Sequence, residues 1–256
     1  MSLAITELAA FAERLADASG PIARGYFRSG LNIDIKADDS PVTRADREVE
    51  AHLREMIAAA YPDHGIIGEE HGSTGADREY VWILDPIDGT KAFITGRPLF
   101  GTLIGLLREG RPILGVIDHP ALNERWIGGL DYPTRFCGAP ARTRVCATVE
   151  NAILAATAPE MFVGKPAFEG LRQRVKLPVW GGDCFNYGLV ASGHLDLAVE
   201  AGMAIYDYLP LVPVITAAGG VITDWRGQAL GLDSGDEVLA AGDPALHQAA
   251  VAILKG

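Results

Sequence analysis

The chain has 256 residues, 33 of them acidic and 22 basic, so it carries a formal excess of 11 negative charges. This balance argues against a nucleic-acid surface, which needs clustered lysine and arginine, and against a polybasic membrane-docking face. A hydrophobic fraction of 48% with 21% charged residues is typical of a folded globular protein. The length predicts one large domain or two closely packed subdomains.

The cysteines and the N-terminal segment indicate a compartment. Cys137, Cys146 and Cys184 form no Cys-x-x-Cys pair, and their odd number does not favour a disulfide framework. The first residues lack the basic and then apolar pattern of a signal peptide. No segment reaches the roughly 18 apolar residues that a membrane span needs. We therefore expect a cytoplasmic protein.

In the first half of the chain, apolar residues recur at helical spacing up to a helix end expected near Gly20, where Gly-Pro follows. A second helix is expected over residues 43–60, stopped by Tyr-Pro. The alternating residues 31–36 predict a half-buried strand. Further apolar segments predict strands over 65–68, 80–84, 100–107 and 113–118, with a hairpin connection at 108–112.

The composition changes over residues 131–144, which are rich in arginine and contain two prolines. We place a boundary at about residue 142, between an N-terminal α+β subdomain (1–142) and a C-terminal α/β subdomain (143–256). The second half alternates predicted strands at 151–156, 175–179, 195–200 and 221–224 with predicted helices at 184–192, 206–218 and 244–254. This alternation predicts a layered α/β (α+β) architecture.

The densest motif is Trp-Ile-Leu-Asp-Pro-Ile-Asp-Gly-Thr, which ends at Thr90. An apolar strand carries Asp85 at its carboxyl end, and Asp88 follows after a proline bend. Two carboxylates on one tight turn, with the Ile87 carbonyl beside them, suit a hard cation such as Mg²⁺. The amides of Gly89 and Thr90 would open a short helix, whose N-terminus can hold a phosphate.

Each acidic segment also has a simpler interpretation. Asp88-Gly89 is a common hairpin-turn dipeptide. Glu69 and Glu70, which follow the strand at 65–68, are typical of a solvated loop. If that strand lies beside the strand that carries Asp85, however, the carboxylates at the two strand ends come together.

A third acidic segment lies upstream, where Asp38 and Asp39 are followed by Thr43 and Asp46. Threonine followed three residues later by an acidic residue is typical of a helix N-terminus, with Thr43 as the N-cap. We accept this interpretation for Thr43 but not for Asp46, for which the family resemblance described next implies a different role.

Taken together, these motifs resemble the inositol monophosphatase superfamily of Mg²⁺-dependent, lithium-sensitive phosphatases. Pro-Val-Thr-x-x-Asp, Gly-Glu-Glu and Asp-Pro-Ile-Asp-Gly-Thr occur in order, followed by Gly-Gly-Asp-Cys and a Tyr-Asp pair that ends at Asp207. The resemblance runs from about Lys36 to Asp224. It implies a layered αβαβα sandwich of the inositol monophosphatase and fructose-1,6-bisphosphatase type, two packed subdomains, and a homodimer.

The resemblance also implies roles for individual residues. Ligands of a first metal would be Glu69, Asp85 and the Ile87 carbonyl, and those of a second would be Asp85, Asp88 and Asp207. The residues that orient and deprotonate the attacking water would be Asp46 and Thr90, assisted by Glu69, and the phosphate would be held by the amides of Gly89 and Thr90. The cofactor would be Mg²⁺, two or three ions per site, with Mn²⁺ as a substitute and Li⁺ and Ca²⁺ as inhibitors.

Within the superfamily the chain is most similar to the histidinol-phosphatase branch, in Gly-Gly-Asp-Cys and in Gly-Val-Ile-Asp-His-Pro. Asp183 adds a carboxylate where inositol-hydrolysing members have small uncharged residues, and Glu200 matches a position that contacts the alcohol. Two carboxylates suit a cationic alcohol such as L-histidinol. The alternative for Asp183 is a helix cap.

We therefore expect a Mg²⁺-dependent phosphomonoesterase that hydrolyses L-histidinol phosphate in histidine biosynthesis by a metal-activated water. The alternatives are an inositol-1-monophosphatase or a broad-specificity sugar or nucleotide phosphatase, and, more remotely, a non-catalytic metal- or phosphate-binding protein. The expected partner is a small phosphorylated metabolite, not nucleic acid or a membrane. The chain has no Cys-x5-Arg, Asp-x-Asp or P-loop motif, which argues against other phosphatase and nucleotide-hydrolysing chemistries.

Overall fold

A computed structural model of the whole chain describes residues 4–29, 33–35 and 41–255. The predicted strand over 31–36 lies only partly within these ranges: β1 (Ile33–Ile35) pairs with β2 (Pro41–Thr43) in a two-stranded antiparallel sheet. Asp38 and Asp39 lie outside the described residues, as does the side chain of Thr43 with its predicted cap.

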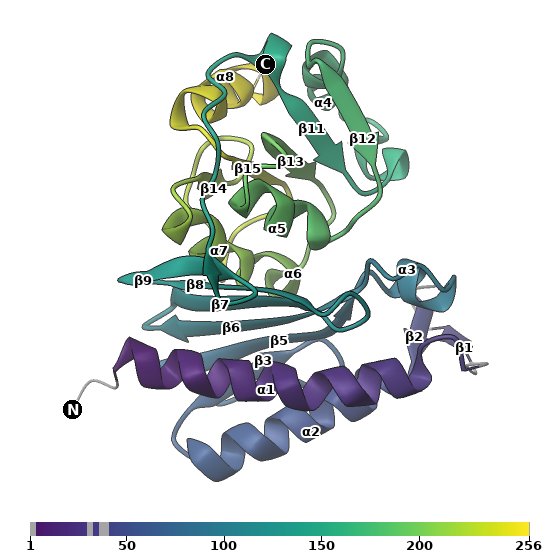
Figure 1. Cartoon of the computed structure of the whole chain (residues 1–256), viewed down its shortest axis with the longest axis vertical. Helices are drawn as coiled ribbons and strands as arrows, with labels where there is room; N and C mark the ends of the chain where they lie inside the picture. The colour runs from purple at the N-terminus through teal and green to yellow at the C-terminus, as the bar shows by residue number, and fades with distance from the viewer. Residues whose placement is uncertain (1–3, 30–32, 36–40, 256) are drawn as a thin grey trace.

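Helices α1 (Ile5–Tyr26) and α2 (Arg44–Ala60) lie side by side on one face of a large sheet (Figure 1). The predicted end of the first helix near Gly20 is wrong, because α1 continues through Gly20-Pro21. A proline removes one helix hydrogen bond, but buried packing stabilises the turn around it. Gly20 lies against Pro120, and Ala23 is fully buried. Tertiary packing here outweighs local preference.

The large sheet has eight strands in the order β10-β9-β8-β7-β6-β5-β3-β4. The strands are β3 (Gly65–Gly68), β4 (Gly72–Thr74), β5 (Tyr80–Asp88), β6 (Gly101–Arg108), β7 (Arg111–His119), β8 (Glu124–Gly129), β9 (Tyr132–Phe136) and β10 (Ala139–Pro140). All neighbours are antiparallel except β3 and β5, which are parallel. The predicted hairpin between β6 and β7 is confirmed. Strands β4, β8, β9 and β10 were not predicted.

The second half of the chain builds a five-stranded sheet in the order β12-β11-β13-β15-β14. Its strands are β11 (Ile153–Ala156), β12 (Leu177–Trp180), β13 (Leu197–Glu200), β14 (Val221–Thr223) and β15 (Val238–Ala241). Its helices are α4 (Pro166–Arg172), α5 (Phe185–Ala191), α6 (Ile205–Tyr208), α7 (Leu211–Ala217) and α8 (Pro244–Leu254), with short 3₁₀ turns at Val149–Asn151 and Pro159–Phe162. Helix α4 and strand β15 were not predicted from the sequence.

Helices α5, α6 and α7 lie between the two sheets, while α4 and α8 cover the outer face of the smaller one (Figure 1). The layers are therefore helix, sheet, helix, sheet, helix, which confirms the predicted αβαβα sandwich. One buried core includes residues of both sheets and of this middle layer. Because the two halves share that core, a subdomain boundary at about residue 142 stays a prediction.

The single helix predicted over residues 206–218 is wrong, because it divides into α6 and α7 at Pro210. Proline cannot donate a helix hydrogen bond, whereas Pro213 is tolerated in the first turn of α7. The larger sheet accommodates this break closely. A side chain at Gly115 would lie 1.8 Å from the Pro210 carbonyl oxygen. Because Gly115 has no side chain, the chain after α6 can pack closely on β7. Helix α6 itself contacts β5, and this contact brings the C-terminal half to the site.

Candidate active site

The site begins where the pairing of two parallel strands ends. In the β3–β5 pair, Gly68 is opposite Leu84, so this pairing ends immediately before Glu69 and Asp85, while β5 continues along β6 to Asp88. The Glu69 amide donates to the Leu84 carbonyl at 3.2 Å. The expectation that these two strands lie together is confirmed. Because the strands are parallel, their carboxyl ends point toward the same edge of the sheet.

Beyond Asp85 the strand is irregular before it enters a helix. Its pairing with β6 shifts between Asp85 and Asp88, and Gly89 adopts a left-handed φ of 80° before α3 (Thr90–Ile94). The hairpin interpretation of Asp88-Gly89 is therefore wrong, and the predicted short helix is confirmed. A left-handed residue favours glycine because it has no Cβ to clash with the backbone.

Two groups of carboxylates gather at this edge. In the first, oxygens of Asp85, Asp88 and Asp207 lie within 4.8 Å of one another. Asp207 comes from α6, where its Oδ2 accepts a hydrogen bond from the Ala204 amide at 2.7 Å. Asp88 Oδ2 accepts from the Cys184 amide, also at 2.7 Å. Elements from both halves of the chain therefore place one acidic group.

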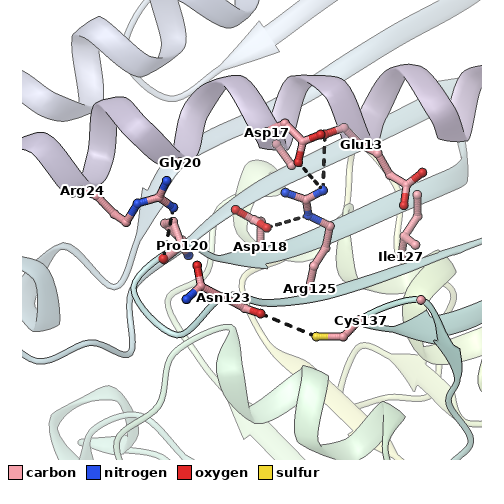
Figure 2. Close-up of a pocket in the computed structure, with 12 residues that line it drawn as sticks. Glu13, Asp17, Gly20, Arg24, Asp118, Pro120, Asn123, Arg125, Ile127 and Cys137 are labelled. Carbon is pink, nitrogen blue, oxygen red and sulfur yellow. Dashed lines mark hydrogen bonds and ion pairs between the residues drawn. The ribbon is translucent and has the colours of Figure 1, made fainter.

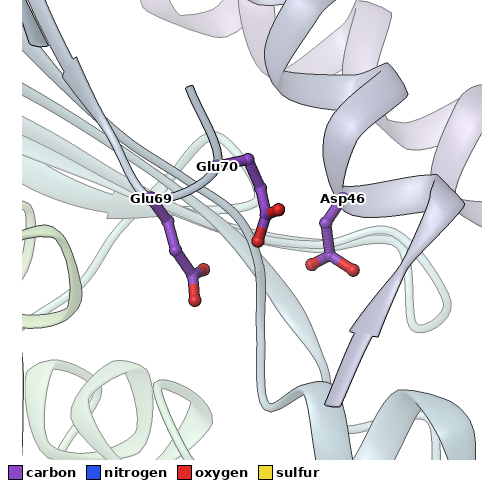
Figure 3. Close-up of side chains that lie close together, drawn as sticks. All are labelled: Asp46, Glu69 and Glu70. Atoms are coloured by element: carbon purple, nitrogen blue, oxygen red, sulfur yellow. The ribbon is translucent and has the colours of Figure 1, made fainter. Parts of the chain in front are cut away.

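The second group comprises Asp46, Glu69 and Glu70, also within 4.8 Å of one another. Figure 3 shows the Glu70 side chain between those of Glu69 and Asp46, which comes from the first turn of α2. Glu70 was noted only as part of an acidic pair and had no predicted role. Its proximity to Asp46 depends on the packing of α2 beside β3, so no local sequence signal indicates it.

A buried carboxylate from α2 holds this turn in place. Glu50 Oε2 accepts from the Glu70 amide at 2.6 Å, and Oε1 accepts from the His71 amide at 3.1 Å. Arg54, one turn further along the helix, donates to Oε1 at 2.7 Å. No role was predicted for Glu50. Its spacing from Arg54 is that of a helix ion pair.

Crowding and burial change the protonation of the first group. Burial, and then the charge of Glu69, raises the pKa of Asp85 well above its usual range. Burial, and then the charge of Asp207, raises the pKa of Asp88 to about 7. Burial also raises the pKa of Asp207 to about 7. Carboxylates enclosed together are unfavourable without a cation.

These residues fit a metal ion by an independent criterion. Asp85 Oδ1 is buried and accepts no hydrogen bond from any described residue, which is costly for a carboxylate unless a ligand is bound. A cluster of carboxylate oxygens is the donor set that hard divalent cations prefer. Both acidic groups could therefore hold metal ions. The Ile87 carbonyl lies at the same turn, where it accepts from the Thr90 hydroxyl at 3.2 Å.

The structure brings the two predicted substrate residues to the same place. A cavity of about 150 Å³, called the site cavity below, is lined by Asp88, Thr157, Asp183, Cys184, Glu200 and Asp207, among others. A side chain at Gly89 would lie 3.1 Å from the Asp183 carboxyl carbon. The N-cap of α5 is Cys184 and has no side-chain cap bond, so the alternative role of Asp183 as a helix cap is wrong.

Glu200, the last residue of β13, is almost fully buried. Its Oε1 accepts from the amide and the hydroxyl of Thr157, at 3.0 and 2.8 Å. Its Oε2 accepts no hydrogen bond from any described residue. Burial raises the pKa of Glu200 to about 8 and that of Asp183 to about 7, with the charge of Asp88 adding to both. Both side chains are therefore suited to a cationic partner.

A larger cavity of about 430 Å³ lies elsewhere, between α1 and the β7–β8 connection (Figure 2). Its basic centre, Arg125, is already paired with Asp17 at 2.8 Å and with Asp118 at 2.6 Å. None of the predicted site residues lines this cavity. Because Arg125 is already paired and no predicted site residue lies there, the smaller site cavity is the candidate active site.

Comparison with known proteins shows the class of protein to which this site belongs. A sequence profile of the inositol monophosphatase family matches residues 4–255, and the relatives described below are phosphatases. The protein is therefore a phosphomonoester hydrolase, as predicted. The chain belongs to the inositol monophosphatase family, which confirms the resemblance seen in the motifs.

Relatives differ in the activity that their names state. The chain is 46% identical over 267 residues to the chloroplastic bifunctional phosphatase IMPL2 of Arabidopsis thaliana, covering 99% of this chain and 77% of the relative. It is 37% identical over 218 residues to a histidinol-phosphatase of Chlorobaculum parvum, covering 84% of each. A solved inositol monophosphatase from Zymomonas mobilis superposes with a TM-score of 0.91 at 44% identity over 100% of both chains.

Among the described residues, no helix is both long and apolar enough to cross a membrane.

Proposed function

We propose that the protein hydrolyses L-histidinol phosphate to L-histidinol and phosphate. One observation carries the proposal: Asp183 and Glu200 line the same cavity as Asp88 and Asp207. The phosphate end of a substrate would meet the acidic groups and their metal ions, while the alcohol end would meet two further carboxylates. Three relatives named histidinol-phosphatase, 31–37% identical over most of the chain, support this substrate.

The charge of the alcohol explains why carboxylates would select it. L-histidinol carries an ammonium group and an imidazole, and hydrogen bonds between ionised partners are about twice as strong as neutral ones. A cation beside Glu200 would supply the donor that Oε2 lacks. It would also favour the ionised form of a carboxylate whose pKa burial raises to about 8.

The metal ligands that we propose are Glu69, Asp85, the Ile87 carbonyl, Asp88 and Asp207, with Mg²⁺ as the natural ion and Mn²⁺ as a substitute. When bound, such ions stabilise the negative charge of a transferring phosphoryl group. Asp46 and Thr90 would orient a water molecule and accept its proton, and the amides of Gly89 and Thr90 would hold the phosphate. We expect Li⁺ and Ca²⁺ to inhibit.

A second candidate substrate is inositol 1-phosphate. The similarity to the Zymomonas mobilis inositol monophosphatase extends over the whole chain, and the Arabidopsis relative is named as bifunctional. A neutral hydroxyl could also donate to Glu200 Oε2. The two candidates differ in charge, so their relative KM values separate them.

We further propose a homodimer in a reducing compartment such as the cytoplasm, with subdomains that divide at about residue 142. Three free cysteines, Cys137, Cys146 and Cys184, support the compartment. Exposed apolar side chains on the edge strand β12, among them Leu177 and Trp180, support an interface between copies. Light scattering on the purified protein would give the oligomeric state.

The proposed activity is tested by measuring phosphate release with Mg²⁺ from four substrates. These are L-histidinol phosphate, inositol 1-phosphate, fructose 1,6-bisphosphate and 3′-phosphoadenosine 5′-phosphate. We expect the highest kcat/KM for L-histidinol phosphate and complete loss of activity with EDTA. A higher kcat/KM for inositol 1-phosphate would establish the second candidate, and absence of turnover on all four substrates would contradict both.

A further inference from the structure

Thr157 contacts both of the residues that face the alcohol end of the proposed substrate. It directly follows β11 and lines the site cavity. Its amide and its hydroxyl both donate to Glu200 Oε1, at 3.0 and 2.8 Å. The same hydroxyl oxygen accepts from the Asp183 amide at 3.1 Å. One small side chain therefore contacts two carboxylate residues that lie 26 and 43 residues further along the chain.

These bonds determine which Glu200 oxygen is free for a ligand. Two donors from one residue hold Oε1, so the carboxylate cannot rotate without losing both bonds. Oε2 is then left buried, with no hydrogen bond from any described residue. A buried acceptor without a donor is unfavourable. A donor on the ligand would remove that cost, so the arrangement favours a ligand that carries N–H or O–H groups.

The bond to Asp183 fixes a strained turn. Asp183 has a φ of 47° and follows two glycines, Gly181 and Gly182, that also have positive φ values. A left-handed conformation is unfavourable for a residue with a side chain unless contacts hold it. The Thr157 hydroxyl supplies one such contact, and the turn places the Asp183 carboxyl beside Gly89 in the metal-binding turn.

We propose that Thr157 is a positioning residue that sets the substrate specificity of this phosphatase. It directs Glu200 Oε2 and the Asp183 carboxylate together at a cationic nitrogen on the alcohol of the phosphate ester. The proposal rests on the proposed function. It adds that selectivity for a cationic alcohol requires the hydroxyl of Thr157 as well as the two carboxylates.

The test removes only that hydroxyl. Thr157→Val keeps the β-branched shape and the backbone amide, whereas Thr157→Ser keeps the hydroxyl. We expect Thr157→Val to raise KM for L-histidinol phosphate about 10-fold, the loss expected for hydrogen bonds to a charged group. We expect KM for 4-nitrophenyl phosphate, which has no cation, and kcat for both substrates to change less than about twofold. Thr157→Ser should return KM close to the wild-type value.

Thr216→Val is the matched control, because Thr216 is exposed on α7 and its hydroxyl bonds only within that helix. A double variant shows whether Thr157 acts through Glu200. Once Glu200→Gln is present, Thr157→Val should raise KM much less than it does alone, since coupled residues are not additive. If Thr157→Val does not fold by circular dichroism, Thr157→Ala enters the same comparison.

The outcomes separate the two proposals. If wild-type protein shows no preference for L-histidinol phosphate over 4-nitrophenyl phosphate, the proposed function is wrong and the role of Thr157 falls with it. If wild-type protein shows the preference and Thr157→Val retains it, the proposed function stands and the role of Thr157 alone is overturned. Equal losses on both substrates, with a lower melting temperature, would also overturn it, because that result indicates a purely structural residue.

Discussion

The candidate active site has two acidic sides that are built in different ways. On the side of the proposed metal ions, Asp85, Asp88 and Asp207 crowd together, and Asp85 Oδ1 accepts no hydrogen bond from the described residues. On the side of the proposed alcohol, Thr157 donates two hydrogen bonds to Glu200. On the first side, burial and the charges of neighbouring carboxylates raise the pKa values of the group. The second side has one oriented carboxylate, Glu200, with one oxygen that accepts no hydrogen bond from the described residues.

This difference teaches how an acidic protein can bind a phosphate ester. The crowded side needs cations for charge balance, and these cations can then attract the phosphate. On the hydrogen-bonded side, Thr157 at the end of β11 donates to the Glu200 carboxylate and accepts from the Asp183 amide. A net charge of −11 would oppose phosphate binding by the protein alone. The phosphate end of the substrate therefore depends on the metal cations of the first side, whereas a cationic alcohol end depends on the carboxylates of the second side.

The largest expected effect comes from the crowded side. Asp85→Asn and Asp207→Asn should each lower kcat for L-histidinol phosphate by about 1,000-fold or more, because each removes a negative ligand from the proposed metal site. The measurement is phosphate release over a Mg²⁺ titration. Asp63→Asn is the control, since the Asp63 side chain is 99% exposed. An active Asp85→Asn, Asp207→Asn double variant would refute the metal assignment.

The second prediction concerns the hydrogen-bonded side. Asp183→Asn and Glu200→Gln should raise KM for L-histidinol phosphate by about 10- to 100-fold, because each weakens a hydrogen bond between charged groups. KM for inositol 1-phosphate should change much less, and kcat should be similar in both cases. Glu150→Gln, at an exposed surface carboxylate, is the control. Equal effects on both substrates would contradict a cation-selective cavity.

The third prediction concerns a buried histidine that contacts Cys184, the residue whose amide donates to Asp88. Buried His119 lies with Nε2 3.6 Å from Cys184 Sγ, and its Nδ1 donates to the Phe100 carbonyl at 2.8 Å. Burial lowers the pKa of His119 to about 4. The folded state therefore prefers the neutral ring, and stability that is present above pH 6.5 is lost as the pH falls towards 4. The full loss is on the order of 3 kcal/mol.

Urea unfolding at pH 7.5 and pH 5 measures this effect in wild type and in His119→Gln. The variant has no group to titrate, so its free energy of unfolding should fall less between the two pH values. A wild-type decrease that matches the decrease of the variant would show that His119 does not protonate on unfolding. Cys184 directly follows Asp183, and its amide donates to Asp88. The contact between His119 and Cys184 therefore lies next to residues of both acidic sides.

The smallest expected effect concerns Glu50, which holds the Glu69-Glu70 turn from behind. Glu50→Gln keeps one acceptor and replaces the other, so we expect the Mg²⁺ concentration for half-maximal activity to rise about threefold, with kcat at saturation unchanged. Glu55→Gln, on an exposed face of the same helix, should have no effect. An unchanged Mg²⁺ requirement in Glu50→Gln would remove any role of Glu50 in ordering this turn.

Local patterns were sufficient for parts of the molecule that depend on neighbours in the sequence. Apolar strands followed by acidic residues predicted that the strands before Glu69 and Asp85 lie side by side, and the parallel β3–β5 pair confirms it. The same reasoning failed where contacts between residues far apart in the sequence determine the local structure. Helix α1 passes Gly20-Pro21 because Pro120 lies against it. The prediction of a single helix over 206–218 did not account for the packing of Pro210 on the larger sheet.

Residues that act through contacts could not be found from the sequence for the same reason. Thr157 was one residue of an ordinary strand end, and Glu50 was one carboxylate of a charged helix. Their importance follows from hydrogen bonds to Glu200, Asp183, Glu70 and His71 that the chain forms only after folding. A sequence motif identifies residues that contact the substrate. It carries little information about the residues that position those side chains.

The sequence alone determined the family, the αβαβα architecture and the acidic character of the site, because those follow from motifs and from the alternation of strands and helices along the chain. Tertiary structure decided how the carboxylates divide into two sides. Contacts between α6 and β5 bring in Asp207, and the Thr157 hydrogen bonds orient Glu200. These contacts join segments far apart in the chain, and their geometry depends on packing that no local pattern encodes.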